Sequence, residues 1–314
     1  MSDEFEKYIL KNRKDYVALT KVQDRELGRL YIQFANSIKK DAERIVNKLS
    51  WSYSQKIKEM KVLLREADRL TDGFKGILNK ALIDSAGLGQ EVNGIILDRY
   101  SKRLSGAGFD VDLKQVLTGV TDDTVKLIYD RIWDDGLKLS DRIWILDRRA
   151  KREIERIVLE EIASGRPASS KVLEARLNKL LNPDRRAIFT KLHGRRVQFD
   201  AARLMRTERT IAFREADRMA SLKNPGLIGI QWHTSGDACA ECSDLASGGD
   251  KGLGSGVYLP ENLPANPHPH CACYTTDKAM SSKEFTTNWL EFMKDKSSQP
   301  ELGQWYENVY LKAA

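Results

Sequence analysis

The sequence predicts a mainly α-helical protein, in which long N-terminal helices are followed by a small C-terminal α+β module with a loop-rich segment. Three observations support this fold class. Apolar residues recur every three or four positions through most of the first 222 residues, the period of an amphipathic helix. Beyond them the period changes to alternation, and glycine, proline and asparagine become frequent. All four cysteines lie in this second part.

Composition narrows the class of protein. The chain has 314 residues, of which 41% are hydrophobic, enough for about two domains with a buried core. No apolar run reaches the roughly 18 residues of a spanning helix, and the acidic, mixed N-terminus is unlike a secretory leader. Four cysteines are too few for a disulfide scaffold of this size. We therefore expect a soluble intracellular protein without a membrane partner.

Two apolar stripes predict the first helices. One runs from Leu27 to Leu49 and the next from Ile57 to Ile77, both in alternating steps of three and four. Helix breakers then cluster at residues 85–89 and 105–108, which predicts turns around a short helix near residues 91–104.

Later helices are predicted from their end signals. Asp122 and Asp123 predict the start of a helix, because acidic side chains stabilise the positive end of the helix dipole. Gly136 predicts the end of that helix. Ser140 is a favourable N-cap for a helix that Gly165 and Pro167 would end.

The rest of the chain divides at residues 223–226. A short helix is expected from Ser169 or Ser170 to Leu181, and a long basic helix over residues 196–221. Residues 229–234 alternate like a strand, and residues 235–276 leave little room for regular helix. The tail beyond Ser281 offers one amphipathic helix and an aromatic end, which we expect to pack on its own domain.

Positive charge is concentrated between Lys171 and Thr210. This block holds eleven basic and four acidic residues, and the excess of seven equals the net charge of the whole chain, +7. Such a block favours a polyanion or an acidic protein surface as partner, and a solvated helix face with paired arginines is the alternative. The candidate binding residues are Arg185, Arg186, Lys191, Arg195, Arg196 and Arg203.

The four cysteines form two close pairs. Cys239 and Cys242 make a C-x-x-C, and Cys271 and Cys273 make a C-x-C. A turn can aim the first pair at one ion, and alternate positions of an extended segment point to one face. Thiolates and imidazoles suit tetrahedral zinc better than magnesium or calcium.

Other interpretations of the cysteines stay open. His268 or His270 can replace one cysteine as a ligand. The cysteines can instead be buried free thiols, a redox pair or disulfides. With four protein ligands no position remains for a reactive water, so we expect a structural zinc that holds the loop-rich segment together.

Part of the chain resembles a known family, the Mu F-like phage head morphogenesis proteins, also called minor head or minor capsid proteins. The resemblance rests on residues 232–237, on the C-x-x-C, and on the run Pro-His-Pro-His-Cys-Ala-Cys over residues 267–273. The segments Leu-Ser-Asp-Arg-Ile-Trp at 139–144 and Arg-Thr-Glu at 206–208 also resemble family positions. The resemblance covers roughly residues 137–276. It departs from the family pattern at Ala272, where the family commonly has arginine.

The resemblance implies a low-copy internal head component. Such a protein associates with the portal protein and with capsid or scaffolding protein, contacts double-stranded DNA in some members, and resides in the virion after assembly in the host cytoplasm. It makes Cys239, Cys242, His268, Cys271 and Cys273 the candidate metal set. The basic block would then neutralise phosphates without reading sequence.

The predicted organisation has four regions. Residues 1–136 form an N-terminal helical region for docking on the portal or scaffold, and residues 137–222 a basic helical region. Residues 223–278 form the zinc module, and residues 279–314 the tail.

Two enzyme classes are alternatives. An HNH-like nuclease needs a general-base histidine and separate ligands for a catalytic metal, and only His193 and His233 would remain for them. The family's C-terminal domain has also been compared with ADP-ribosyltransferases, in which Arg206 would grip the dinucleotide and Glu208 follows it. We expect no catalysis.

Overall fold

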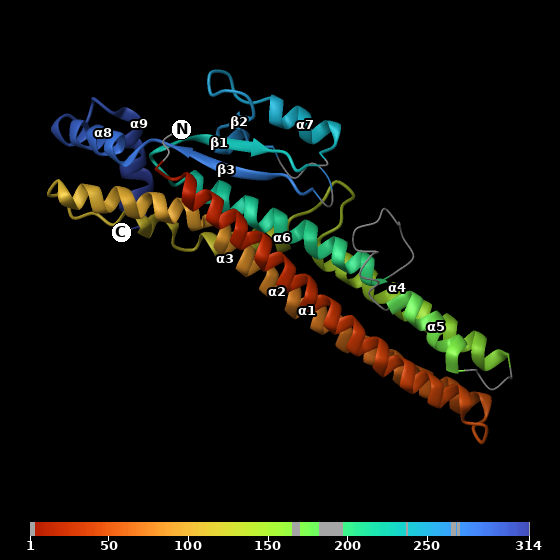
Figure 1. Cartoon of the computed structure of the whole chain (residues 1–314). Coiled ribbons are helices and arrows are strands. Elements are labelled where there is room, and N and C mark those ends of the chain that lie inside the picture. Colours follow the sequence, from red (N-terminus) through yellow and green to blue (C-terminus); the bar gives the residue numbers. More distant parts are fainter. Residues whose placement is uncertain are drawn as a thin grey trace. The chain divides into compact units, whose positions relative to one another are not determined.

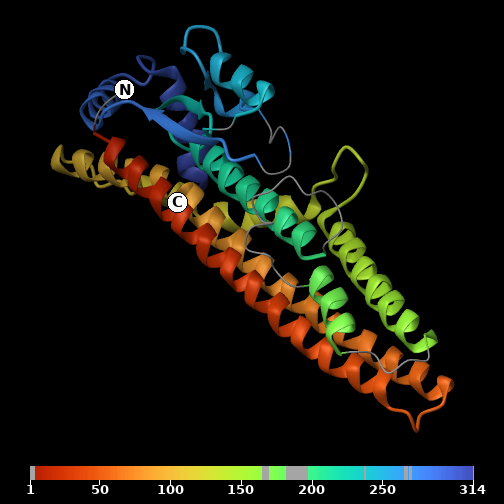
Figure 2. The same cartoon turned by 45° about the vertical axis from the view of Figure 1, so that its right-hand side comes forward.

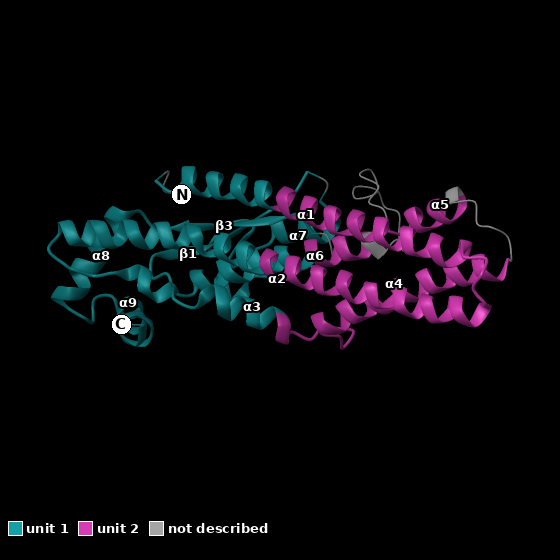
Figure 3. Ribbon diagram, turned by 90° about the horizontal axis from the view of Figure 1, so that it is seen from below, with its two compact units in different colours: residues 1–19, 82–128, 207–314 teal, residues 20–81, 129–206 magenta. Residues whose placement is uncertain are grey.

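A computed structural model describes residues 4–164, 170–181, 197–236, 238–264, 268 and 271–313. The chain divides into two compact units, coloured separately in Figure 3. Unit 1 comprises residues 1–19, 82–128 and 207–314, and unit 2 comprises residues 20–81 and 129–206. The predicted fold class is confirmed: the described part is mainly helical, with one small antiparallel sheet near the C-terminus. The four functional regions predicted from the sequence stay a prediction.

The regular secondary structure in the described part of unit 2 is all helical. It contains most of α1 (Glu6–Asn47), the first half of α2 (Tyr53–Gly106), α4 (Leu139–Ala163), α5 (Ser170–Leu181) and the start of α6 (Val197–Ser221). Figures 1 and 2 show the α1–α2 hairpin of this unit in orange. Most of the two predicted stripes is buried, with Ile38 and Ile45 on α1 and Met60 on α2 almost inaccessible, but Leu49, the predicted end of the first stripe, is 81% exposed and lies beyond α1. Each such side chain contributes about 1.5–3 kcal/mol to stability.

Polar contacts join the helices of unit 2. Lys39 on α1 lies 2.6 Å from Glu174 on α5, and Thr71 on α2 donates a hydrogen bond to Asp147 on α4 at 2.7 Å. These partly exposed contacts add less than the apolar stripes, because solvent screens them.

The predicted helix ends are shifted by a few residues. Helix α3 (Val120–Asp130) has Asp122 and Asp123 in its first turn but ends before Gly136, which adopts a positive φ in the turn that follows. The predicted N-cap Ser140 lies inside α4, whose N-cap is Lys138. The Asp141 carboxylate accepts the Lys138 backbone N–H at 2.8 Å and so caps the helix in place of Ser140.

The predicted break at residues 85–89 is wrong, because α2 continues through it to Gly106. Within unit 1, a Cβ at Gly89 would lie 2.2 Å from the carbonyl oxygen of Phe213 on α6. Glycine is needed here for close helix packing, and it ends no helix. The second cluster, at 105–108, does end α2, and Gly108 has the positive φ of a turn.

Unit 1 holds the sheet, in the order β2-β1-β3. Strand β1 (Leu227–His233) pairs antiparallel with β2 (Val257–Tyr258) and β3 (Tyr274–Ala279). Trp232 faces Thr275 across β1 and β3, and Ile230 faces Asp277. Because opposed residues share a face, these four buried side chains form one side of the sheet. In Figures 1 and 2, α6 runs along one side of the strands and α7 (Ala240–Ser247) lies on the other.

The C-terminal tail packs on its own unit, as predicted. Helix α8 (Ser282–Lys294) buries Phe285, Trp289 and Phe292, and Phe285 stacks on Tyr100 of α2 with ring centroids 4.1 Å apart. After α9 (Pro300–Trp305), the Trp305 indole donates to the Lys223 carbonyl at 2.9 Å. The chain continues through η3 (Tyr306–Tyr310) and α10 (Leu311–Ala313), and two other short helical turns, η1 (Leu113–Leu117) and η2 (Pro260–Asn262), lie earlier.

Across these described ranges, no helix combines the length and the apolar character needed to cross a membrane.

Candidate metal centre

The cysteine pairs are positioned by short regular elements. Cys239 is the N-cap of α7 and Cys242 lies in its first turn, so the C-x-x-C begins a helix within the segment expected to be loop. Cys271 and Cys273 immediately precede β3 and are separated by one residue. Tyr258 ties α7 to β2 by donating to the Leu245 carbonyl at 2.7 Å. Both pairs are therefore held against the same end of the sheet.

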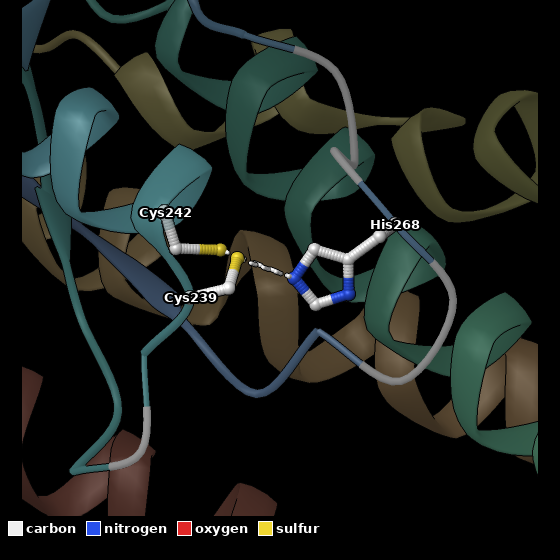
Figure 4. Close-up of side chains that lie close together, drawn as sticks. All are labelled: Cys239, Cys242 and His268. Atoms are coloured by element: carbon white, nitrogen blue, oxygen red, sulfur yellow. Dashed lines mark hydrogen bonds between the residues drawn. The ribbon is translucent and has the colours of Figure 1, made fainter.

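The structure brings the predicted donors together. The Nε2 atom of His268 lies 3.3 Å from the sulfur of Cys239 and 3.3 Å from that of Cys242, as Figure 4 shows. The sulfurs of Cys242 and Cys271 are 3.7 Å apart. Two groups result, Cys239–Cys242–His268 and Cys242–Cys271–Cys273, in each of which the ligand atoms lie within 4.8 Å of one another. Cys242 belongs to both groups and is the centre of the cluster.

These distances fit a tetrahedral zinc site. With Zn–S of about 2.3 Å and Zn–N of about 2.05 Å, tetrahedral geometry separates two sulfurs by about 3.8 Å and a sulfur from a nitrogen by about 3.6 Å. The observed 3.7 Å and 3.3 Å lie close to these edges. The cluster offers five donors for four positions, so one of them would lie outside the coordination shell of a bound zinc ion. His270, the other histidine considered from the sequence, lies outside the described residues.

Burial shapes the acidity of these thiols. Cys242, Cys271 and Cys273 are buried, whereas Cys239 is exposed. Burial raises the pKa of Cys242, and hydrogen bonds with the neighbouring thiols raise it further. Burial also opposes ionisation of Cys273, but hydrogen bonds from Ser235 and from neighbouring thiols lower its pKa overall. A bound dication would favour the thiolate throughout the cluster, since metal binding displaces thiol protons.

Arg214 connects the cluster to α6. Its Nη2 donates to the Cys271 sulfur at 3.3 Å and to the Cys273 carbonyl oxygen, and its guanidinium lies over the Trp232 ring at 4.5 Å. Trp232, Tyr258 and the three buried cysteines form one packed core. Sequence reasoning did not identify Arg214 as part of the site.

A buried acid pair lies on the same helix and sheet. Thr275 donates to Asp217 on α6 at 2.7 Å, while Ser221 and Asn93 donate to Asp277 on β3 at 2.8 and 2.9 Å. Burial raises the pKa of Asp217 well above its usual value, and the adjacent Asp277 raises it further. Burial also raises the pKa of Asp277, to about 6. Both carboxyls are therefore harder to ionise than an exposed aspartate, mainly because they are buried.

Arg214, Asp217 and Ser221 on α6 leave one signal in the sequence. They are spaced by three and four residues, so they lie on one face of α6, and all three are buried. A polar stripe with helical spacing between apolar residues is the pattern that would have found them.

The predicted polyanion-binding residues are mostly beyond the described ranges. Arg185, Arg186, Lys191, Arg195 and Arg196 lie in residues 182–196, outside the described residues. Arg203 is described, half-buried on α6. The binding surface predicted from these residues stays a prediction.

Residues named for the enzyme alternatives have structural contacts. His233 Nε2 lies 2.8 Å from the Thr276 hydroxyl and its ring stacks on Tyr274. Burial, together with the positive charge of Arg13, lowers the pKa of His233. Arg206 donates to Asp24 of the same unit at 3.2 Å. His193 lies outside the described residues.

Comparison with known proteins gives no further identification, because no protein-family model, curated protein or solved structure matches the chain.

Proposed function

We propose that residues 225–278 form a module held together by one structural zinc ion, in a protein that acts in phage head assembly as a minor head protein. The observation that carries the zinc proposal is the convergence of four cysteines and His268, from α7 and from the segment before β3. Two groups distant in sequence meet at one point, and their separations match the edges of a tetrahedral site.

The donor set favours a structural role for the ion. Thiolates and imidazole fill all four positions, so no site is left for an activated water. When bound, zinc would supply a cross-link between α7 and the chain entering β3. Such a link stabilises a small module whose strands and helix are short, because metal binding free energy adds to folding free energy.

The role in head assembly is supported by the resemblance of residues 232–242 and 267–273 to Mu F-like minor head proteins. Portal protein, capsid or scaffolding protein, and packaged double-stranded DNA are the partners we propose. The excess positive charge between residues 171 and 210 suits a protein that faces packaged DNA, since phosphate neutralisation requires no sequence readout. We propose no catalytic activity.

Two experiments test the two parts separately. Elemental analysis of the untagged protein tests the zinc proposal. Co-expression with the portal and capsid proteins of the same phage tests the assembly role: the chain should co-sediment with portal and be present in assembled heads at low copy. Heads that form normally and exclude the chain would contradict the assembly role while leaving the zinc proposal intact.

A further inference from the structure

Arg214 is a buried cation beside the proposed zinc ligands. Its side chain comes from the middle of α6, and the residue is 4% exposed. Three contacts fix its guanidinium: the Cys271 sulfur at 3.3 Å, the Cys273 carbonyl oxygen, and the face of Trp232 at 4.5 Å. Two of these contacts are to the C-x-C segment and the third is to the adjacent strand β1.

A charged donor has a clear physical role at this position. Zinc with three thiolates and one imidazole carries one net negative charge, and with four thiolates it carries two. Burying such a charge is costly unless a cation or hydrogen-bond donors compensate it. An N–H group directed at a thiolate sulfur supplies both, and residues in that position commonly orient the metal ligands they contact.

The geometry also explains why the residue is arginine. A planar guanidinium can donate from one Nη atom to a sulfur and a carbonyl while its face stacks on an indole. A lysine ammonium carries the same charge, but it lacks the flat face that stacks on Trp232.

We propose that Arg214 is a positioning residue of the metal centre, which holds Cys271 toward the ion and offsets the negative charge of the thiolate ligands. This inference rests on the proposed zinc binding. It links the occupancy of the metal site to the packing of α6 against the sheet, since one side chain contacts both.

The test compares zinc affinities of full-length variants by competition with a chromophoric chelator. Arg214→Met should bind Zn²⁺ about 10–100-fold more weakly than the parent, and Arg214→Lys should fall between the two. Arg218→Met is the matched control, because Arg218 lies one turn along α6 and pairs with Glu215 at 2.9 Å. Its zinc affinity should equal that of the parent.

A second readout separates positioning from a general loss of stability. In the Co²⁺-loaded protein, loss of the N–H···S hydrogen bond should shift the thiolate-to-cobalt charge-transfer bands to lower energy. Folded Arg214→Met with zinc affinity within twofold of the parent and unchanged bands would overturn the inference. A parent that binds no zinc would overturn the proposed zinc site itself, so the two failures are distinguishable.

The parent protein provides a measurement if Arg214→Met does not fold. With ¹⁵N-labelled arginine, zinc should slow hydrogen exchange of the Arg214 Nη groups as the Cys271 thiolate forms. Identical exchange with and without bound zinc would overturn the inference.

Discussion

Replacing Asp217 with asparagine should remove the pH dependence of stability that this buried carboxyl causes. In the folded protein, burial and the adjacent Asp277 raise the pKa of Asp217 well above its usual value. In the unfolded chain, the same carboxyl ionises near pH 3.9, to within about a unit. The folded state thus binds more protons than the unfolded state, and the free energy of unfolding falls as pH rises.

The magnitude follows from the pKa shifts. Asp277 rises from 3.8 to about 6, which at about 1.4 kcal/mol per pKa unit makes the folded protein about 3 kcal/mol less stable above pH 6 than below pH 4. The pKa of Asp217 is raised in the same direction, so its ionisation also lowers the free energy of unfolding as pH rises. In Asp217→Asn, the new side chain would retain the shape of the protonated acid. Its amide oxygen would accept from Thr275, and its NH₂ group would donate to Asp277.

Urea unfolding of the zinc-loaded protein at pH 6, 7 and 8 measures this effect. Between pH 6 and 8, the free energy of unfolding of the parent should fall more steeply with pH than that of Asp217→Asn. The lowered pKa of His233 makes an opposite contribution, which cancels in the comparison because both proteins retain it. Asp98→Asn is the control, since Asp98 is exposed on α2 and bonds Lys102. Equal pH slopes for the parent and Asp217→Asn would refute the raised pKa of Asp217 in the folded protein.

Three further predictions follow from packing, the metal site and charge. Gly89→Ala should lower the free energy of unfolding by about 1–3 kcal/mol, because its Cβ would meet the Phe213 carbonyl. Gly87→Ala, with nothing within 4 Å, should raise it by about 0.5–1 kcal/mol, and destabilisation of both alike would contradict a continuous α2. Cys239→Ser or Cys271→Ser should make residues 225–278 sensitive to limited proteolysis, while α1 and the first half of α2 stay resistant. The control Ser247→Ala should leave the resistance of residues 225–278 unchanged. The same unchanged resistance in the cysteine variants would argue against a metal cross-link. Charge reversal at Arg185, Arg186, Arg195 and Arg196 should weaken DNA binding and reduce the slope of affinity against salt, and an unaltered slope measured by fluorescence anisotropy would exclude these residues as the contact.

Local sequence patterns predicted the helices well where an apolar stripe was long. Helices are present at both predicted stripes, although α1 already begins at Glu6 and α2 continues to Gly106, and the basic helix α6 has nearly the expected bounds. The amphipathic helix α8 lies in the tail, as predicted. The error at residues 85–89 has a physical cause: a glycine needed for contact with Phe213, distant in sequence, carries the same local signal as a glycine that ends a helix. Helix α7 was missed because its eight residues are too short for a stripe to be visible.

The candidate site was predictable in its ligands but not in its surroundings. Cysteine spacing identified the four cysteines that converge, because metal ligands must be specific residue types at short separations. His268 entered the candidate set through its place beside the C-x-C and the family resemblance. Arg214 and the pair Asp217–Asp277 could not be assigned in this way. Their roles depend on which strand lies against α6, and the register that places Thr275 opposite Trp232 is a tertiary feature.

Metal content with thiol reactivity tests the central claim most directly. The protein should be purified without an affinity tag, analysed for metals, and titrated with a thiol reagent before and after denaturation. We predict one zinc per chain, with the cysteine thiols shielded until the protein unfolds. Absence of metal, together with four thiols that react freely in the folded protein, would contradict the zinc-held module.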